Sequence, residues 1–187
     1  MSDRSFALFE TPIGVCGITW SDKGIAGLQL PEASAAATRS RVQRRWTQAK
    51  EAAPPPDVQH AIDKVLALLK DGTTDLGDIA LDLAAAPEFH RKVYDVARTI
   101  PPGQTMTYGE IAKRLGVPHE SREVGQALGK NPVAIIVPCH RVLGADGKMG
   151  GFSANGGVST KRRMLEIERA TAVSAGPLFD AAPPRSG

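Results

Sequence analysis

The residues of this 187-residue chain that are best suited to chemistry are Cys139 and His140, which are adjacent and are followed by Arg141. A proline precedes the cysteine, and the apolar run 133–137 leads into it. A thiol beside a histidine and a cation can become a thiolate nucleophile, and a carboxylate can complete the set by orienting the histidine. Glu168, on a predicted helix, could supply that carboxylate. The pattern predicts an activated thiol at the exit of a buried strand and leaves its target open.

Three other uses of a cysteine fit less well. Structural zinc needs about four Cys or His ligands at short paired spacings, whereas the possible ligands are scattered: Cys16, His60, His90, His119, Cys139 and His140. We therefore expect no metal site. A redox regulator would need a second cysteine close by, and Cys16 is remote in sequence. A cysteine hydrolase would need an oxyanion hole, for which the sequence gives no separate signal.

Composition describes an ordinary globular protein, with 42% hydrophobic and 23% charged residues. No apolar stretch approaches the roughly 20 residues that span a bilayer, and residues 1–4 do not begin a secretory signal. We expect a cytoplasmic protein with no membrane role, in which both cysteines are free thiols. The net charge of +3 permits an anionic partner without requiring one.

The first half of the chain is typical of a small sheet covered by helices. Short apolar runs separated by turn residues predict a three-stranded antiparallel meander over residues 1–30. Helices are expected over 33–47 and 57–72 from composition and periodicity. The alternation of Ile79, Leu81 and Leu83 with Ala80 and Asp82 predicts a further strand of the same sheet. This unit should close near residue 84, which gives an α+β fold class.

The second half changes to short helices separated by glycine and proline. Thr107 and Glu110 fit a capping box at the start of a helix over 107–115. Ser121 is placed to cap the next helix, which should end at Gly129, and this pair suggests a helix-turn-helix. Further predicted segments are a helix over 87–100, a helix over 159–170 and a disordered tail over 171–187.

Helix pairs of this kind often only fill a hydrophobic core. The residues that would face a partner therefore have to distinguish DNA binding from core packing. At the start of the second helix, Ser121 and Arg122 lie where backbone amides point outward, and Gly125 permits close approach. Glu120 and Glu123 count against a simple phosphate-binding face. From these residues alone, DNA binding and core packing both remain possible.

Several motifs, taken together, resemble the O6-alkylguanine-DNA alkyltransferase family, also called methylated-DNA–protein-cysteine methyltransferases. The segments that carry the resemblance are Thr107-Tyr108-Gly109-Glu110-Ile111-Ala112, Arg122-Glu123-Val124-Gly125, Asn131-Pro132, Ile136-Val137-Pro138-Cys139-His140-Arg141-Val142 and Gly156-Gly157-Val158-Ser159-Thr160-Lys161. The resemblance implies two domains: an α/β, ribonuclease H-like domain over 1–84, and a DNA-binding and alkyltransferase domain over 85–170.

The resemblance also implies roles for the reactive residues. Cys139 would attack the alkyl carbon of an O6-alkylguanine, with guanine as the leaving group. His140 would deprotonate the thiol through a water molecule, and Glu168 would polarise His140. Tyr108 would donate a proton toward the guanine ring, and Asn131 would brace the turn behind the nucleophile.

The same resemblance implies how DNA is held. The target nucleotide must leave the base stack, because its O6 atom lies inside the duplex. The residues implied in DNA binding are Arg122, Tyr108, Ser121, Gly125 and Ala127, with Arg122 filling the vacated space. The implied substrate pocket contains Val142, Phe152, Ser153 and Leu128. Phe152, the loop lengthened by Ala154 and Asn155, and Glu123 depart from the usual family pattern.

The product thioether is stable, and the chain offers no second nucleophile or cofactor to reset it. The resemblance therefore implies a suicidal, single-turnover methyltransferase that acts as a monomer on double-stranded DNA without cofactors, with O4-alkylthymine as a secondary substrate beside O6-alkylguanine. The alternative is a non-enzymatic protein that flags alkylated DNA. Relatives of that kind lack the cysteine, which this chain has.

Overall fold

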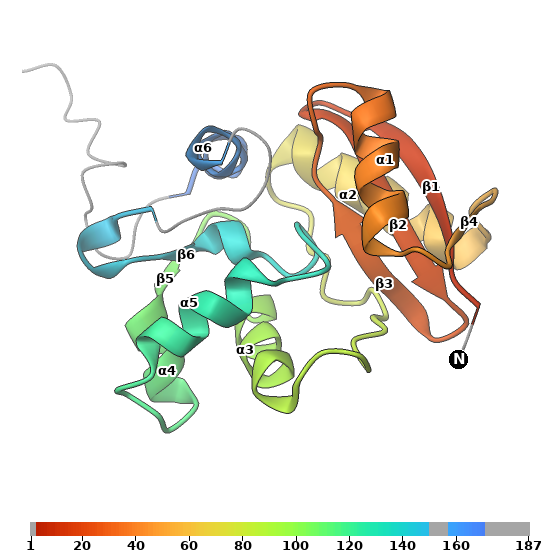
Figure 1. Ribbon diagram of the computed structural model, residues 1–187. Helices are drawn as coiled ribbons and strands as arrows, with labels where there is room; N and C mark the ends of the chain where they lie inside the picture. Colours follow the sequence, from red (N-terminus) through yellow and green to blue (C-terminus); the bar gives the residue numbers. More distant parts are fainter. Residues whose placement is uncertain (1–2, 150–156, 171–187) are drawn as a thin grey trace, which may run out of the picture.

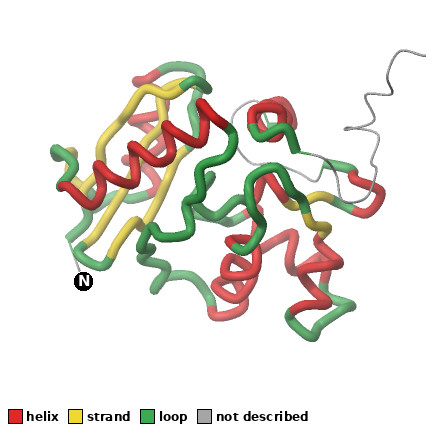
Figure 2. The backbone as a smooth tube through the Cα atoms, turned by 180° about the vertical axis from the view of Figure 1, so that it is seen from behind, coloured by secondary structure: helices red, strands yellow, loops and turns green. Residues whose placement is uncertain are grey.

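The structure, a computed structural model, describes residues 3–149 and 157–170. It has the expected α+β class: a sheet flanked by two helices lies beside a mostly helical part (Figure 1). Figure 2 shows the same two parts from behind, with loop segments running between them. Within the described residues, no helix has the length and apolar character needed to cross a membrane.

The predicted meander is confirmed. Strands β1 (Ser5–Thr11), β2 (Gly14–Ser21) and β3 (Gly24–Gln29) pair antiparallel in chain order. A fourth strand, β4 (Lys50–Glu51), which the sequence pattern did not indicate, pairs parallel to β1, so that the order is β3-β2-β1-β4. The sheet is therefore mainly, and not wholly, antiparallel.

Helices α1 (Ala35–Arg45) and α2 (Pro56–Asp71) cover opposite faces of this sheet (Figure 1). On the α1 face, Val42 and Trp46 pack on Phe6 as a small separate cluster. Two glycines of the sheet allow this close approach: a Cβ at Gly17 would lie 2.5 Å from Val42, and one at Gly27 would lie 2.1 Å from Trp46. The position of α1 is thus fixed by side-chain volume.

The prediction of a strand over residues 79–83 is wrong. The segment forms only an isolated parallel bridge between Leu81 and Ile25, whose amide donates to the Ala80 carbonyl at 2.9 Å. Asp82, expected on the exposed face, is buried instead, and its carboxylate accepts a hydrogen bond from Ser21 Oγ at 2.6 Å. The same carboxylate accepts from the Ala84 amide at 3.3 Å, so a turn replaces further sheet pairing.

The helical part contains the predicted helix-turn-helix. It is formed by α4 (Tyr108–Arg114) and α5 (Ser121–Gly129), behind which lies α3 (Glu88–Arg98). The capping box is present: Thr107 Oγ1 accepts from the Glu110 amide at 3.0 Å, and Glu110 accepts from the Thr107 amide at 2.9 Å. Ser121, in contrast, does not cap α5. It is the first residue of the helix, and the cap position belongs to Glu120, whose side chain makes no capping bond.

The remaining elements surround the reactive cysteine. They are the short parallel pair β5 (Met106–Thr107) and β6 (Val142–Leu143), the 3-10 turns η1 (Cys139–Arg141) and η2 (Ala145–Gly147), and α6 (Val158–Ile167). One apolar cluster runs through both parts of the molecule, from Ile18 and Val65 to Tyr94 and Val137. The helical part is therefore packed on the sheet part.

The apolar run before the cysteine is buried, but it is not a strand. Val133 bridges Leu28 of β3, Ala134 bridges Val137, and Ile135 between them has a positive φ of 71°. This compact turn is held by the Asn131 side chain, which bonds to both of its ends. A left-handed backbone at a β-branched residue is unusual, so the turn depends on its surroundings for stability.

Candidate active site and DNA interface

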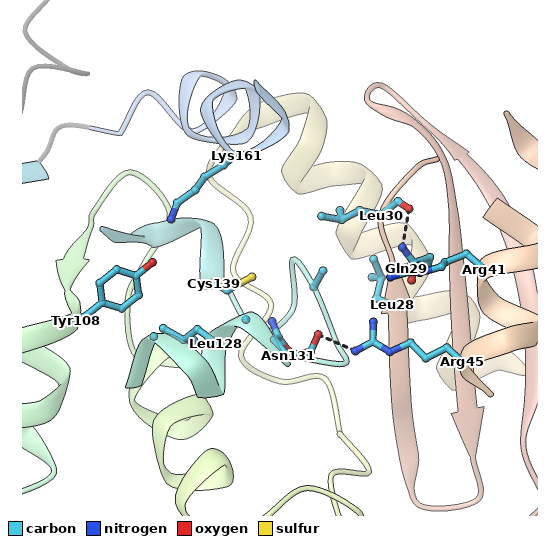
Figure 3. Close-up of a pocket in the computed structure, with 13 residues that line it drawn as sticks. Leu28, Gln29, Leu30, Arg41, Arg45, Tyr108, Leu128, Asn131, Cys139 and Lys161 are labelled. Carbon is cyan, nitrogen blue, oxygen red and sulfur yellow. Dashed lines mark hydrogen bonds between the residues drawn. The ribbon is translucent and has the colours of Figure 1, made fainter. Parts of the chain in front are cut away.

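Cys139 lies at the bottom of a pocket between the two parts of the molecule. The thiol residue is only 8% exposed and starts the η1 turn. On the helical side the pocket is lined by Tyr108, Leu128, Asn131 and Lys161 (Figure 3). Residues of β3 and α1 line the opposite side, so the nucleophile is reached through an opening that both parts share.

Asn131 fixes the backbone behind the thiol, as its predicted bracing role requires. Its Nδ2 donates to the Val137 carbonyl at 2.9 Å, and its Oδ1 accepts from the Val133 amide at 2.9 Å. Burial raises the pKa of the Cys139 thiol, while a hydrogen bond from Asn131 and the charge of Lys161 act in the opposite direction. The resting thiol is thus protonated and needs a base.

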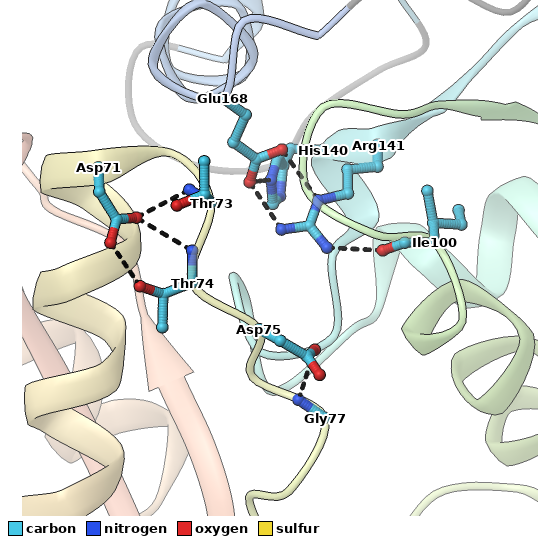
Figure 4. A network of polar contacts seen from close by, with 9 residues as sticks. All are labelled: Asp71, Thr73, Thr74, Asp75, Gly77, Ile100, His140, Arg141 and Glu168. Atoms are coloured by element: carbon cyan, nitrogen blue, oxygen red, sulfur yellow. Dashed lines mark hydrogen bonds and ion pairs between the residues drawn. The ribbon is translucent and has the colours of Figure 1, made fainter.

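The structure brings His140 and Glu168 together (Figure 4). His140 Nε2 lies 2.8 Å from Glu168 Oε1. Arg141 donates to the same carboxylate from Nε at 2.9 Å and from Nη2 at 2.7 Å, and its Nη1 donates to the Ile100 carbonyl at 2.7 Å. All three side chains are buried. The guanidinium therefore balances the buried carboxylate and anchors it to the end of α3.

The surroundings set the protonation state of the histidine. Burial lowers the pKa of His140, although Glu168 opposes this effect. Burial would raise the pKa of Glu168, but His140 and Arg141 bring it down to about 2. A carboxylate only accepts, so a neutral His140 must carry its proton on Nε2. Its Nδ1, which has no hydrogen-bond partner among the described residues, is then the nitrogen able to take a proton.

Tyr108 and Lys161 approach the cysteine from the other side. Burial, and the proximity of Cys139, raise the pKa of Tyr108, which keeps its hydroxyl protonated as a donor. Lys161 is 1% exposed and donates from Nζ to the Val142 carbonyl at 2.6 Å. Its Nζ lies 6.0 Å from the centre of the Tyr108 ring, and burial lowers its pKa to about 8. A buried cation beside a thiol favours the thiolate.

Lys161 had no role in the sequence-based site, although a signal for it existed. Lys161, Leu165 and Glu168 recur at helical spacing, so the buried lysine lies on the side of α6 that leads to Glu168, the residue directly after the helix. Leu165 is fully buried there. A lysine on the buried side of a helix is rare unless it is paired, and this could have marked Lys161 as part of the site.

A second depression adjoins the cysteine pocket. It is lined by Ser121, Arg122, Gly125 and Gln126 of α5 and by Tyr108. Gly125 and Tyr108 also line the cysteine pocket, so the outer face of the helix-turn-helix leads directly to the thiol. Arg122 is exposed at the start of α5. This is the arrangement needed to pass one nucleotide from a duplex to Cys139.

The comparison with known families agrees with this geometry. Residues 88–170 match the family model described as "6-O-methylguanine DNA methyltransferase, DNA binding domain". The methylated-DNA–protein-cysteine methyltransferase of Mycobacterium tuberculosis is 36% identical over 176 residues, which cover 94% of this chain and 98% of the relative. The chain belongs to the methylated-DNA–protein-cysteine methyltransferase family.

Other methyltransferases of the family extend the match. The relative from Methanothermobacter thermautotrophicus is 33% identical over 157 residues, covering 84% of this chain and 81% of its own. The crystal structure of M. tuberculosis OGT in complex with DNA has a TM-score of 0.71 at 34% identity, covering 94% of this chain and 99% of that one. The structural match therefore includes the sheet part as well as the helix-turn-helix.

Membership of the methyltransferase family confirms the resemblance found in the sequence and the α+β fold with its helix-turn-helix.

Not every predicted site residue lies where its role requires. Ala127 is 0% exposed, since it belongs to the inner side of α5, where its carbonyl accepts from the Tyr94 hydroxyl at 2.7 Å. Its side chain is therefore not part of a DNA-contacting surface.

The predicted substrate pocket is described only in part. Leu128 lines the cysteine pocket, and the Val142 carbonyl holds Lys161 while the Val142 side chain is buried. Phe152 and Ser153 lie outside the described residues, as do Ala154 and Asn155.

Proposed function

We propose that this protein repairs DNA by moving an alkyl group irreversibly from O6-alkylguanine in a duplex to Cys139 Sγ. The observation that carries the proposal is a buried thiol beside a His140–Glu168 pair, at the inner end of a helix-turn-helix face. The names of the relatives agree: they are methylated-DNA–protein-cysteine methyltransferases. The chemistry then follows from the protonation states of the site.

Activation of the thiol begins with neutral His140. The proton of Cys139 passes through a water molecule to His140 Nδ1, while Nε2 stays bonded to Glu168. The resulting imidazolium is stabilised by the Glu168 carboxylate, which does not itself need to take the proton. The charge of Lys161 favours the thiolate at the moment it forms.

The displacement is a single step at the alkyl carbon. A bond forms between Cys139 Sγ and this carbon as the bond from the carbon to guanine O6 breaks, and the electron pair of that bond goes to the purine. Tyr108 donates its proton toward the ring as negative charge develops there, and its raised pKa keeps the hydroxyl protonated until that point. Restored guanine leaves, and a thioether stays on Cys139.

Access to the base requires its extrusion from the duplex. We propose that α5 enters the minor groove, that Arg122 occupies the space vacated in the stack and that Tyr108 crowds the rotating phosphate. Gly125 lies beside the Tyr108 ring, since a Cβ at this position would be in ordinary contact with the ring at 3.8 Å, so the two residues border the same path. Ser121 lies beside the same path.

One experiment tests the proposal directly. The protein is incubated with duplex DNA that carries a labelled O6-methylguanine, and the label is located by peptide mass. We expect at most one equivalent, on the Cys139 peptide, and none in Cys139→Ser. The matched control is Cys16→Ser, because Cys16 is buried in β2 and burial raises its pKa to about 12; it should transfer normally. Transfer by Cys139→Ser, or multiple turnovers, would refute the mechanism.

The alternative is a protein that only flags alkylated DNA. The presence of Cys139 argues against it, and binding of the lesion without label on the protein would favour it.

We further propose that the protein works as a monomer in the cytoplasm without a cofactor, and that the domain boundary lies near residue 84. O4-alkylthymine is proposed as a secondary substrate, measurable with the same labelled assay.

A further inference from the structure

The pocket of Cys139 is lined by residues of the sheet part as well as of the helix-turn-helix. Arg41 and Arg45, both on α1, line the side of the pocket opposite Tyr108 (Figure 3). Arg45 Nη2 donates to the Asn131 carbonyl at 3.2 Å, which ties α1 to the segment just beyond the end of α5. Figure 1 shows α1 and α5 on the same face of the molecule. The proposed DNA path along α5 therefore leads on to α1.

Three arginines are gathered on this flank of α1. Arg41, Arg44 and Arg45 are spaced three and four residues apart, so they share one side of the helix, and all three are exposed. The nearest carboxylate to Arg41 is that of Glu32 at 3.9 Å, and the partner of Arg45 is a neutral carbonyl. Arg44 makes no hydrogen bond or ion pair within residues 3–149 and 157–170. The flank carries an excess of positive charge.

The opposite flank of the same helix is different. Arg39 lies about 160° around the helix axis from Arg41 at roughly 100° per residue, and it forms a two-point pair with Glu51, at 3.3 and 3.0 Å. Exposed arginines are often no more than a solvated surface. Here, however, the arginine directed away from the pocket has a two-point carboxylate partner, whereas the three arginines on the pocket side share the single, longer contact from Arg41 to Glu32.

The electrostatic state of Arg45 agrees with an anionic partner. Arg45 is exposed as a residue, but its charged end is partly buried, and this burial together with the neighbouring charge of Arg41 lowers its pKa, so the two cations destabilise each other in the free protein. A phosphate placed between them would relieve this repulsion and would be held by guanidinium groups, which match phosphate oxygens in geometry.

We propose that the Arg41–Arg44–Arg45 flank of α1 is a second phosphate-binding surface, which holds the DNA backbone beyond the end of α5. This goes further than the proposed function, which places DNA on the helix-turn-helix alone. The stretch from Arg122 to Asn131, which is helical as far as Gly129, advances roughly 14 Å over nine steps at about 1.5 Å per residue. This equals the axial length of about four base pairs, so the α1 contacts lie about that far from the extruded nucleotide.

The test uses the full-length protein and two matched charge removals on α1. Arg41→Gln/Arg44→Gln removes the proposed contacts, and Arg39→Gln removes an arginine from the paired flank. Binding to a 24-base-pair duplex with one central O6-methylguanine is measured from about 50 to 300 mM salt. Each lost phosphate contact should reduce the slope of log K against log salt by about 0.9, so the double variant should lose about 1.8 while Arg39→Gln keeps the wild-type slope.

Two further measurements identify where the contacts act. In the first, the duplex is shortened stepwise on one side of the lesion and then on the other. Wild type and the double variant should bind with equal affinity once fewer than about four base pairs remain on the α1 side. Arg44→Gln should react with free O6-benzylguanine at the wild-type rate. The proposal would be overturned if the salt slope of the double variant equalled that of wild type, or if Arg39→Gln changed the slope as much as the double variant. Alkyl transfer by wild type in the same experiment would show that the proposed function still holds.

Discussion

His140 Nε2 and Glu168 Oε1 lie 2.8 Å apart although 28 residues separate the two side chains in the chain. Both side chains are almost fully buried, at 1% and 2% exposure. The carboxylate fixes the histidine tautomer, and Arg141 prevents the carboxylate from being an uncompensated buried charge. This hydrogen bond therefore affects both the free energy of unfolding and the ability of His140 to accept a proton.

Replacing Glu168 by Gln should damage activity and stability together. The amide can donate to Nε2, which favours the tautomer with its proton on Nδ1 and removes the base. We expect the rate with free O6-benzylguanine to fall by about 10² or more, within the range known for general bases. Loss of the partner of Arg141 should lower the free energy of unfolding by about 3–5 kcal/mol, as measured by urea denaturation.

The control for Glu168→Gln is Arg141→Gln. This variant also breaks the buried ion pair but leaves the bond from His140 to Glu168 in place. It should lose similar stability and much less rate at neutral pH. If Glu168→Gln reacted at the wild-type rate, the orienting role of the carboxylate would be wrong.

The rate of alkyl transfer should depend on pH through His140. Its pKa lies below the usual 6.5 because of burial, so the residue is already neutral at pH 7. The rate constant for O6-benzylguanine should be flat near pH 7 and should fall only as the pH drops through this lowered pKa. Quenched time courses analysed by mass from about pH 4.5 to 7.5 measure it, and a midpoint above the usual 6.5 would contradict the assignment.

Stability should follow a lower pH window, set by Glu168. Its folded pKa of about 2 is below the 4.5 of the unfolded chain, so the unfolded state binds the proton first. The stabilisation is fully present above pH 4.5, is lost as the pH falls toward about 2, and is on the order of 3 kcal/mol. Denaturation midpoints of wild type and Glu168→Gln should therefore converge in acid.

Gly72 should position the catalytic carboxylate from the sheet part of the molecule. It ends α2 with a φ of +71°, and a Cβ there would lie 2.1 Å from the Ile167 carbonyl oxygen and 3.0 Å from Glu168 Cα. Gly72→Ala must displace the segment that carries Glu168, so we expect a rate loss of about tenfold or more with O6-benzylguanine, on the scale of a roughly 1 Å misplacement.

Gly116→Ala is the matched control for Gly72→Ala. Gly116 has a φ of +75°, and a Cβ there would meet no atom within 4 Å. Both variants carry the cost of a left-handed alanine, about 1–2 kcal/mol, but only one meets the backbone of Glu168. Equal rates for the two variants with the free base would show that Gly72 affects stability alone.

The elements that the sequence predicted correctly are those specified by local contacts. The capping box needs only Thr107 and Glu110, three residues apart, and the meander is marked by its turns. The pairing of His140 with Glu168 was implied by the family resemblance, because nothing in the spacing of 28 residues brings two side chains together.

The predictions that failed did so where tertiary contacts override a local pattern. The apolar run 133–137 has the composition of a strand, but two bonds from Asn131 close it into a turn. Asp82 occupies an exposed position by alternation, yet Ser21 provides it with a buried partner. Ala127 was assigned to the DNA face by the family resemblance, whereas the direction of α5 turns it inward. These outcomes depend on packing that no short window contains.

Arg122→Ala should separate extrusion of the base from the chemical step. Arg122 is exposed on the α5 face, and among the described residues Tyr108 and Gly125 line both its pocket and the Cys139 pocket. Losing the side chain that fills the stack should slow repair of duplex O6-methylguanine by about 10-fold to 10²-fold, equivalent to the few kcal/mol that unstacking costs. Reaction with free O6-benzylguanine needs no extrusion and should change by less than about twofold. Arg114→Ala, on the neighbouring helix and exposed, controls for the loss of one positive charge near DNA. Equal losses on both substrates would instead mean that Arg122 supports the pocket and does not replace the base in the stack.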